Sequence, residues 1–93
     1  MVVFVDVDDT LIRSVGPKRI PIPRVVDRVR SLHRDGHTLY LWSTAGADYA
    51  RSAASELGLV ECFAGFLPKP NLIIDDQPVA EWRACAHEYP LSA

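Results

Sequence analysis

The sequence is poor in cysteine and has no long apolar run. Its two cysteines, Cys62 and Cys85, stand far apart without a C-x-x-C spacing, so neither a zinc site nor a redox motif is indicated and reduced, buried thiols are expected. No apolar stretch reaches the length of a transmembrane helix, and no basic-plus-apolar leader opens the chain. We therefore expect a cytoplasmic protein that does not bind a membrane.

Excess charge of either sign is also small. The formal net charge is −2, which argues against a nucleic-acid partner. The charges are nevertheless unevenly placed, since seven of the ten lysines and arginines lie between Arg13 and Arg34. A basic stretch behind an acidic cluster could attract a phosphate ester, or it could be the solvated face of a helix.

The 93 residues are expected to form one domain, residues 1–93, because the chain contains no repeat, linker or low-complexity tract. Three apolar, β-rich stretches predict buried strands, at residues 2–5, 38–42 and 72–74. Three amphipathic stretches predict helices, at residues 23–36, 47–57 and 79–89. The Gly16-Pro17 pair predicts a tight hairpin or flap, with a plain surface loop as the alternative. Residues 63–67 fit a short edge strand or an extended crossing. This alternation predicts a parallel sheet in an α/β sandwich with right-handed crossovers.

Carboxylates and a threonine follow the first predicted strand. Asp6, Asp8, Asp9 and Thr10 come directly after residues 2–5. In open α/β sheets, ligands bind at the carboxyl ends of the strands. Two carboxylates two residues apart at such an end repel each other, and a divalent cation held between them would relieve the repulsion. The alternative is that they are solvated turn residues that cap the strand.

Polar residues also end the later elements. They are Ser43 and Thr44 after the second predicted strand, Lys69 between Pro68 and Pro70, and Asp75-Asp76 after the third. Together with the D-x-D-x-T pattern of residues 6–10, this order resembles the four signatures of the haloacid dehalogenase (HAD) superfamily of phosphohydrolases. The resemblance covers nearly the whole chain and leaves no room for a cap domain. It implies a three-layer α/β/α, Rossmann-like sandwich with a small parallel sheet.

The resemblance implies a Mg²⁺-dependent phosphatase that acts on a small phosphorylated substrate through an aspartyl-phosphate. Asp6 would be both the nucleophile and a metal ligand. Asp8 would bind the metal through its main-chain carbonyl, while its side chain would act as general acid and base. Asp76 is favoured as a further metal ligand with Asp75 beside it, and the reverse assignment stays open.

The same resemblance assigns phosphate-binding roles. Ser43 would bind a phosphoryl oxygen, with Thr44 as its competitor, or Ser43 could simply cap the next helix. Lys69 would balance the charge between Asp6 and the phosphoryl group, although it could be a solvated turn lysine. Only five residues separate Lys69 from Asp75, so Lys69 must reach the site from a loop. Thr10 would hold the loop after the nucleophile.

Two other functions use similar residues. One is a phospho-accepting receiver module, which we rank low because its nucleophile follows the acidic pair along the chain. The other is a catalytically silent phosphate-binding domain on the same fold. In similar proteins a hairpin overhangs the site, which would place Lys18 and Arg19 at its entrance. A capless chain with exposed sheet edges is also expected to allow homo-oligomers.

Overall fold

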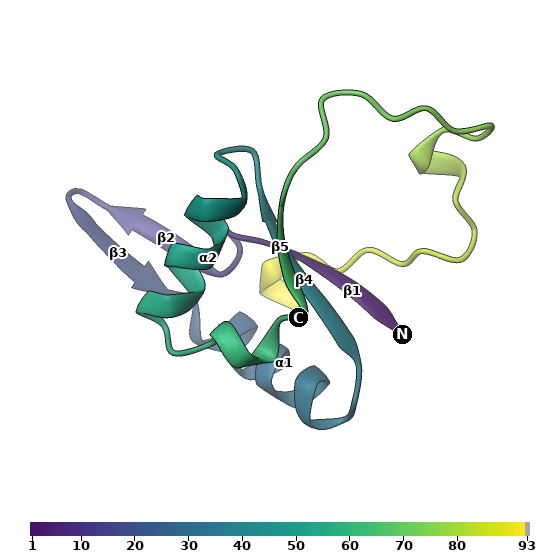
Figure 1. The fold of residues 1–93 in the computed structure, drawn as a ribbon. Helices are drawn as coiled ribbons and strands as arrows, with labels where there is room; N and C mark the ends of the chain where they lie inside the picture. The colour runs from purple at the N-terminus through teal and green to yellow at the C-terminus, as the bar shows by residue number, and fades with distance from the viewer. Residues whose placement is uncertain (93) are drawn as a thin grey trace.

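A small parallel sheet forms the centre of the fold (Figure 1). In this computed structural model, which describes residues 1–92, the strand order is β1-β4-β5. These strands are β1 (Val2–Asp6), β4 (Thr38–Ser43) and β5 (Gly65–Pro68). The register pairs Asp6 with Trp42 and Ser43 with Pro68. The carboxyl ends of all three strands therefore lie at one edge of the sheet.

Two helices connect these strands, close to where the sequence predicts them. Helix α1 (Pro23–Arg34) begins with a proline, whose fixed φ suits the first helical position. Helix α2 (Ala47–Glu56) ends just before Gly58, whose φ of 68° is the left-handed geometry that commonly terminates a helix. Each helix buries one face, through Val25, Val29 and Leu32 in α1 and Ala50, Ala53 and Ala54 in α2.

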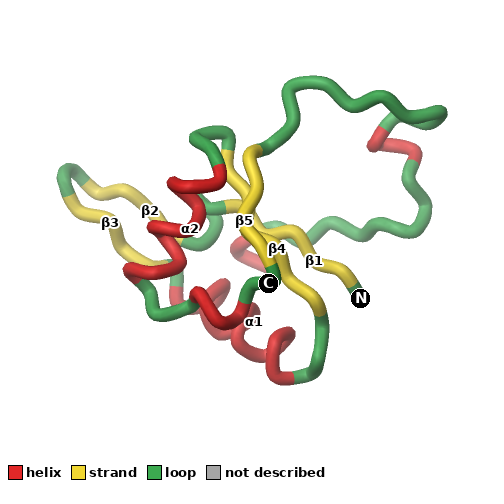
Figure 2. Tube along the Cα trace, in the orientation of Figure 1, coloured by secondary structure: helices red, strands yellow, loops and turns green. Residues whose placement is uncertain are grey.

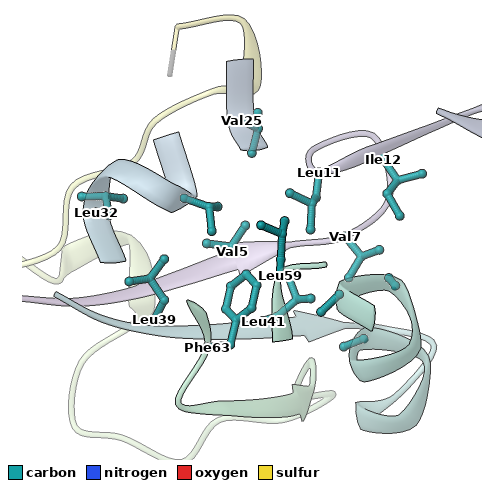
Figure 3. Close-up of a cluster of buried hydrophobic side chains, with 14 residues drawn as sticks. Val5, Val7, Leu11, Ile12, Val25, Leu32, Leu39, Leu41, Leu59 and Phe63 are labelled. Carbon is teal, nitrogen blue, oxygen red and sulfur yellow. The ribbon is translucent and has the colours of Figure 1, made fainter. Parts of the chain in front are cut away.

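Both helices pack on the same face of the sheet. Their buried side chains join Val5, Leu39 and Leu41 in one apolar core (Figure 3). The opposite face carries Phe4 and the half-buried rings of Tyr40 and Trp42, and the side chain of Phe4 is 46% exposed. The strands thus alternate between a buried and an open face, so the prediction of fully buried strands, with Trp42 in the core, is wrong. The described residues form two layers.

The aromatic side chains on the open face pack against one another. The ring of Phe4 lies 5.4 Å from that of Tyr40 and 4.9 Å from that of Trp42, between ring centroids. The second contact is edge-to-face, an arrangement that aromatic quadrupoles favour. This contact partly buries an apolar surface that no helix covers in residues 1–92.

A separate hairpin follows the first strand, as the Gly16-Pro17 pair predicts. Strands β2 (Ile12–Val15) and β3 (Lys18–Pro21) are antiparallel and pair Val15 with Lys18. Gly16 has a φ of 58° in the connecting turn. Such a backbone favours glycine, which has no Cβ to clash. The hairpin projects from the body of the molecule beside α2 (Figure 1).

The C-terminal part of the chain differs from the prediction. Residues 72–74 are not a strand, and the side chains of Leu72, Ile73 and Ile74 are 77%, 46% and 92% exposed. Residues 79–89 are not an α-helix, because only a 3₁₀ turn forms, at Val79–Glu81 (Figure 2). Such short segments depend on packing, since an isolated helix of this length is marginal in water. Residues 70–89 lie exposed and supply no neighbour against which either element could pack.

Two smaller points concern the cysteines and membrane-spanning segments. Both cysteines are free, but Cys62 is half-buried and Cys85 is exposed, so the prediction of two buried thiols is wrong. Burial raises the pKa of the Cys62 thiol above its ordinary value. Among the described residues, no helix has both the length and the apolar character needed to cross a membrane.

Candidate active site at the carboxyl end of the sheet

The loop after β1 is wound around the main-chain carbonyl of Val7. The N–H groups of Leu11 and Ile12 donate to this carbonyl at 2.9 and 3.0 Å, and the Val7 side chain is fully buried. Asp6 and Asp8 flank Val7 along the chain and are less buried than it is. The apolar anchor therefore holds the loop while leaving both carboxylates accessible.

Asp9 has a structural role in the same loop. Its φ of 60° lies in the left-handed region, which aspartate tolerates better than most residues. Its N–H donates to the carbonyl of Ile12 at 2.7 Å, which closes the turn. The side chain of Asp9 is exposed.

Both oxygens of the Asp6 carboxylate have partners. The Lys69 ammonium lies 3.0 Å from Oδ1, and the Thr10 hydroxyl donates to Oδ2 at 3.0 Å. The side chains of Lys69 and Asp6 are 32% and 30% exposed. The structure thus brings Asp6, Thr10 and Lys69 together, in an arrangement that is half-buried but open to a ligand.

Lys69 reaches this position from the end of a strand. Its main-chain N–H donates to the carbonyl of Ser43 at 2.9 Å, which continues the β4–β5 ladder one residue past Pro68. Its ammonium lies 5.7 Å from the centre of the Trp42 ring, a distance at which a cation is attracted to an aromatic face. The sheet itself therefore directs Lys69 toward Asp6, and no helix start is needed.

Ser43 and Thr44 differ sharply in environment. Ser43 is 1% exposed, and its hydroxyl oxygen accepts the N–H of Ala45 at 3.0 Å, in the turn that precedes α2. Thr44 is exposed. Ser43 thus orders the turn before α2 but does not cap the helix, because the N-cap position is Gly46 and no side chain caps it, so the interpretation of Ser43 as a helix cap is wrong. It lies at the strand end next to Asp6, but its side chain shares the face of Leu41 rather than that of Trp42.

A tyrosine that the sequence did not indicate contacts the second carboxylate. The Tyr49 hydroxyl, from α2, donates to Oδ1 of Asp8 at 2.6 Å. Arg19 of β3 donates to the same hydroxyl at 3.2 Å, so the hairpin also reaches the site. The hydrogen bond to Asp8, followed by burial, raises the pKa of Tyr49 above its ordinary value. The signal that could have found Tyr49 is its place in the first turn of a helix that follows a strand end.

The acidic pair of the C-terminal segment lies apart from these groups. Asp75 and Asp76 are exposed, and Oδ1 of Asp75 accepts the N–H of Gln77 at 2.9 Å in a local turn. Within residues 1–92, no three His, Cys, Asp or Glu side chains are gathered so that they could hold a metal ion. Of the predicted four-signature cluster, the structure thus brings Asp6 and Lys69 together, whereas Asp75 and Asp76 lie apart from them.

The groups at the end of β1 suit a hard divalent cation. The Asp6 carboxylate and the main-chain carbonyl of Asp8 are oxygen donors in an accessible loop. Mg²⁺ in phosphoryl-transfer sites usually keeps several waters and takes only one or two carboxylates in addition to phosphate oxygens. The residues present therefore fit Mg²⁺ in an open site.

The fold and the site together define a small α/β protein with a carboxylate–lysine pair at the carboxyl end of a parallel sheet. The sequence model of a family described as "Protein of unknown function (DUF705)" matches residues 1–69, well over half of the chain. The chain therefore belongs to this family. No curated protein and no solved structure matches the chain. The matched residues include Asp6, Asp8 and Lys69 and end before residues 70–93.

Proposed function

We propose that this chain is a Mg²⁺-dependent phosphatase of the HAD type, which hydrolyses phosphomonoesters through an aspartyl-phosphate on Asp6. The observation that carries the proposal is the Asp6 carboxylate at the end of β1, held between the Lys69 ammonium and the Thr10 hydroxyl. The described residues place no cap domain over the site, so the open site could take a small phosphorylated molecule, which we favour, or a phosphorylated group on something larger.

The proposed first step is attack of an Asp6 carboxylate oxygen on phosphorus. A bond forms between this oxygen and phosphorus, and the bond from phosphorus to the alcohol oxygen breaks. A phosphate dianion repels a carboxylate, so positive charge must lie beside both groups. Lys69, 3.0 Å from Asp6, supplies such charge, while Thr10 fixes the orientation of the carboxylate.

The proposed proton carrier is Asp8. Its carboxyl group would protonate the departing alkoxide and then accept a proton from the water that hydrolyses the aspartyl-phosphate. The result is free phosphate and a regenerated Asp6 carboxylate. Asp8 is exposed at the loop after β1, two residues from Asp6, which suits exchange of protons with water.

Asp6 and the main-chain carbonyl of Asp8 would hold the Mg²⁺ ion. When bound, it neutralises charge on the phosphoryl oxygens. Lys69 has a different role from the metal, because it is already paired with Asp6 and offsets the charge of that one carboxylate. The charge of a phosphate dianion is left for the metal to balance.

Removal of the metal tests this proposal. Excess chelator should abolish hydrolysis of 4-nitrophenyl phosphate, and added Mg²⁺ should restore it, because Lys69 alone cannot offset the dianion. The measurement is release of 4-nitrophenolate, with ionic strength held constant. Full activity in chelator would contradict the metal assignment, and no activity with Mg²⁺ would contradict the phosphatase.

We further propose that, when Mg²⁺ and a phosphoryl group are bound at the site, residues 70–89 fold onto the open face of the sheet. This would complete a three-layer sandwich. Three features support this. One edge of β1 has no neighbouring strand among residues 1–92, and the open face carries Phe4. The exposed segment is rich in large apolar side chains, namely Leu72, Ile73, Ile74, Val79 and Trp82. Closure would bury both surfaces and bring Asp76 toward Asp6.

Trypsin can detect this closure, because Arg83 is the only lysine or arginine after Lys69 and the Lys69–Pro70 bond resists the protease. With Mg²⁺ and beryllium fluoride, cleavage after Arg83 should slow by about tenfold, since proteolysis follows the population of the open form. Mass spectrometry would follow release of residues 84–93. Asp76→Asn should lose the protection and Asp75→Asn should keep it. Equal cleavage with and without the ligands would contradict closure.

A further inference from the structure

Tyr49 occupies an unusual position between the hairpin, the helix layer and the loop after β1. Its ring packs partly against the apolar core, while its hydroxyl reaches Oδ1 of Asp8 at 2.6 Å. Asp8 itself is exposed, and an exposed aspartate can adopt several side-chain rotamers. A short hydrogen bond from a side chain that packs partly against the core selects one of them.

The direction of this hydrogen bond is determined by Arg19. Its Nη2 donates to the Tyr49 hydroxyl at 3.2 Å, and its guanidinium lies 5.0 Å from the centre of the ring. Its Nη1 also pairs with Glu56 at 3.3 Å, which ties the hairpin to α2. Because the hydroxyl oxygen accepts from Arg19, its proton is directed to Asp8.

We propose, on the basis of the phosphatase function above, that Tyr49 is a positioning residue for Asp8 and that Arg19 of the hairpin orients Tyr49. The Tyr49 hydroxyl occupies Oδ1, so Oδ2 is the oxygen left to carry the proton to the departing alkoxide. A fixed geometry matters because a misplacement of about 1 Å can cost a reacting group roughly 10²-fold in rate.

The dependence on the leaving group separates positioning from a structural role. The ratio kcat/KM reports steps up to the first irreversible one, which includes departure of the alcohol. Tyr49→Phe should lower kcat/KM for glycerol 2-phosphate by about tenfold, because an alkoxide needs a proton to leave. For 4-nitrophenyl phosphate the decrease should be less than about twofold, because 4-nitrophenolate leaves unprotonated. Equal losses for both substrates would overturn the proposal.

Two further variants refine this test. Tyr40→Phe removes a hydroxyl from the open face of the sheet and should leave both values unchanged. Arg19→Met keeps an unbranched apolar stem but loses the guanidinium and its N–H donors, so it should act in the same direction as Tyr49→Phe with a smaller effect. If Arg19→Met lowers kcat/KM equally for both substrates, the role given to Arg19 is wrong.

A second measurement does not need turnover. In the wild-type protein the Hα–Hβ coupling constants of Asp8 should report one χ1 rotamer, and in Tyr49→Phe they should become averaged. Averaged couplings in the wild type would overturn the positioning role whether or not the protein is an enzyme. Conversely, a fixed Asp8 rotamer in a protein that hydrolyses neither phosphate ester would leave positioning intact and contradict the phosphatase.

Discussion

Asp6→Asn should reduce phosphatase turnover below detection while the protein stays folded. The amide keeps the shape of the side chain and one oxygen but loses the charged oxygen that attacks phosphorus. The variant also loses the ion pair with Lys69, whose side chain is 32% exposed. Such partly exposed pairs contribute about 1 kcal/mol or less to stability, so the fold should survive. Circular dichroism and a 4-nitrophenyl phosphate assay measure the two effects separately.

Asp9→Asn is the matched control for this substitution. It makes the same chemical change three residues away in the same loop, at an exposed side chain, and asparagine accepts the left-handed φ of 60°. Activity should be unchanged. If Asp9→Asn were as inactive as Asp6→Asn, the loss would reflect the loop and not the nucleophile.

Beryllium fluoride tests directly whether the Asp6 carboxylate can form the proposed bond to phosphorus. With Mg²⁺ it should form a tight complex with the wild type, in which beryllium is bonded to the Asp6 carboxylate in the place of the phosphoryl group. Fluorine NMR would detect it, and Asp6→Asn should not form it. Substantial phosphatase activity in Asp6→Asn would exclude the aspartyl-phosphate and make Asp6 a metal ligand that activates water.

Asp8→Asn should lower turnover by roughly 10²–10⁴, the usual effect of losing a general acid and base. The amide oxygen can still accept the hydrogen bond from Tyr49, so the side chain keeps its place but can no longer carry a proton. Binding of Mg²⁺ should be almost unchanged, because the proposed ligand is the main-chain carbonyl. Isothermal titration with Mg²⁺ and steady-state kinetics test the two statements, and loss of metal binding would show that the carboxylate itself is a ligand.

The sequence predicts best those elements that local patterns determine. Helices α1 and α2 lie within one or two residues of their predicted bounds, because apolar spacing and a terminating glycine act over a few residues. The hairpin follows from Gly16-Pro17 in the same way. The sequence predicts more burial for β1 and β4 than the structure has, because a run of apolar residues does not say whether both faces of the strand are covered.

The candidate site was predictable only where a residue follows a strand directly. Asp6 ends β1 and Lys69 follows β5, two parallel strands on either side of β4, so the sheet brings both residues to one edge. Tyr49 contacts Asp8 across 41 residues of chain, through packing that no local pattern encodes. Residues 72–74 look like a strand in the sequence but would need a neighbouring strand to become one.

The contact between Lys69 and Trp42 has an optical consequence. The ammonium lies 5.7 Å from the centre of the indole and pairs with Asp6, so the position of one charge depends on the chemical state of the other. Indole emission is sensitive to a nearby charge. If Asp6 is phosphorylated as proposed, the intensity and wavelength of Trp42 emission should therefore change when Lys69 shifts from the free to the phosphorylated carboxylate.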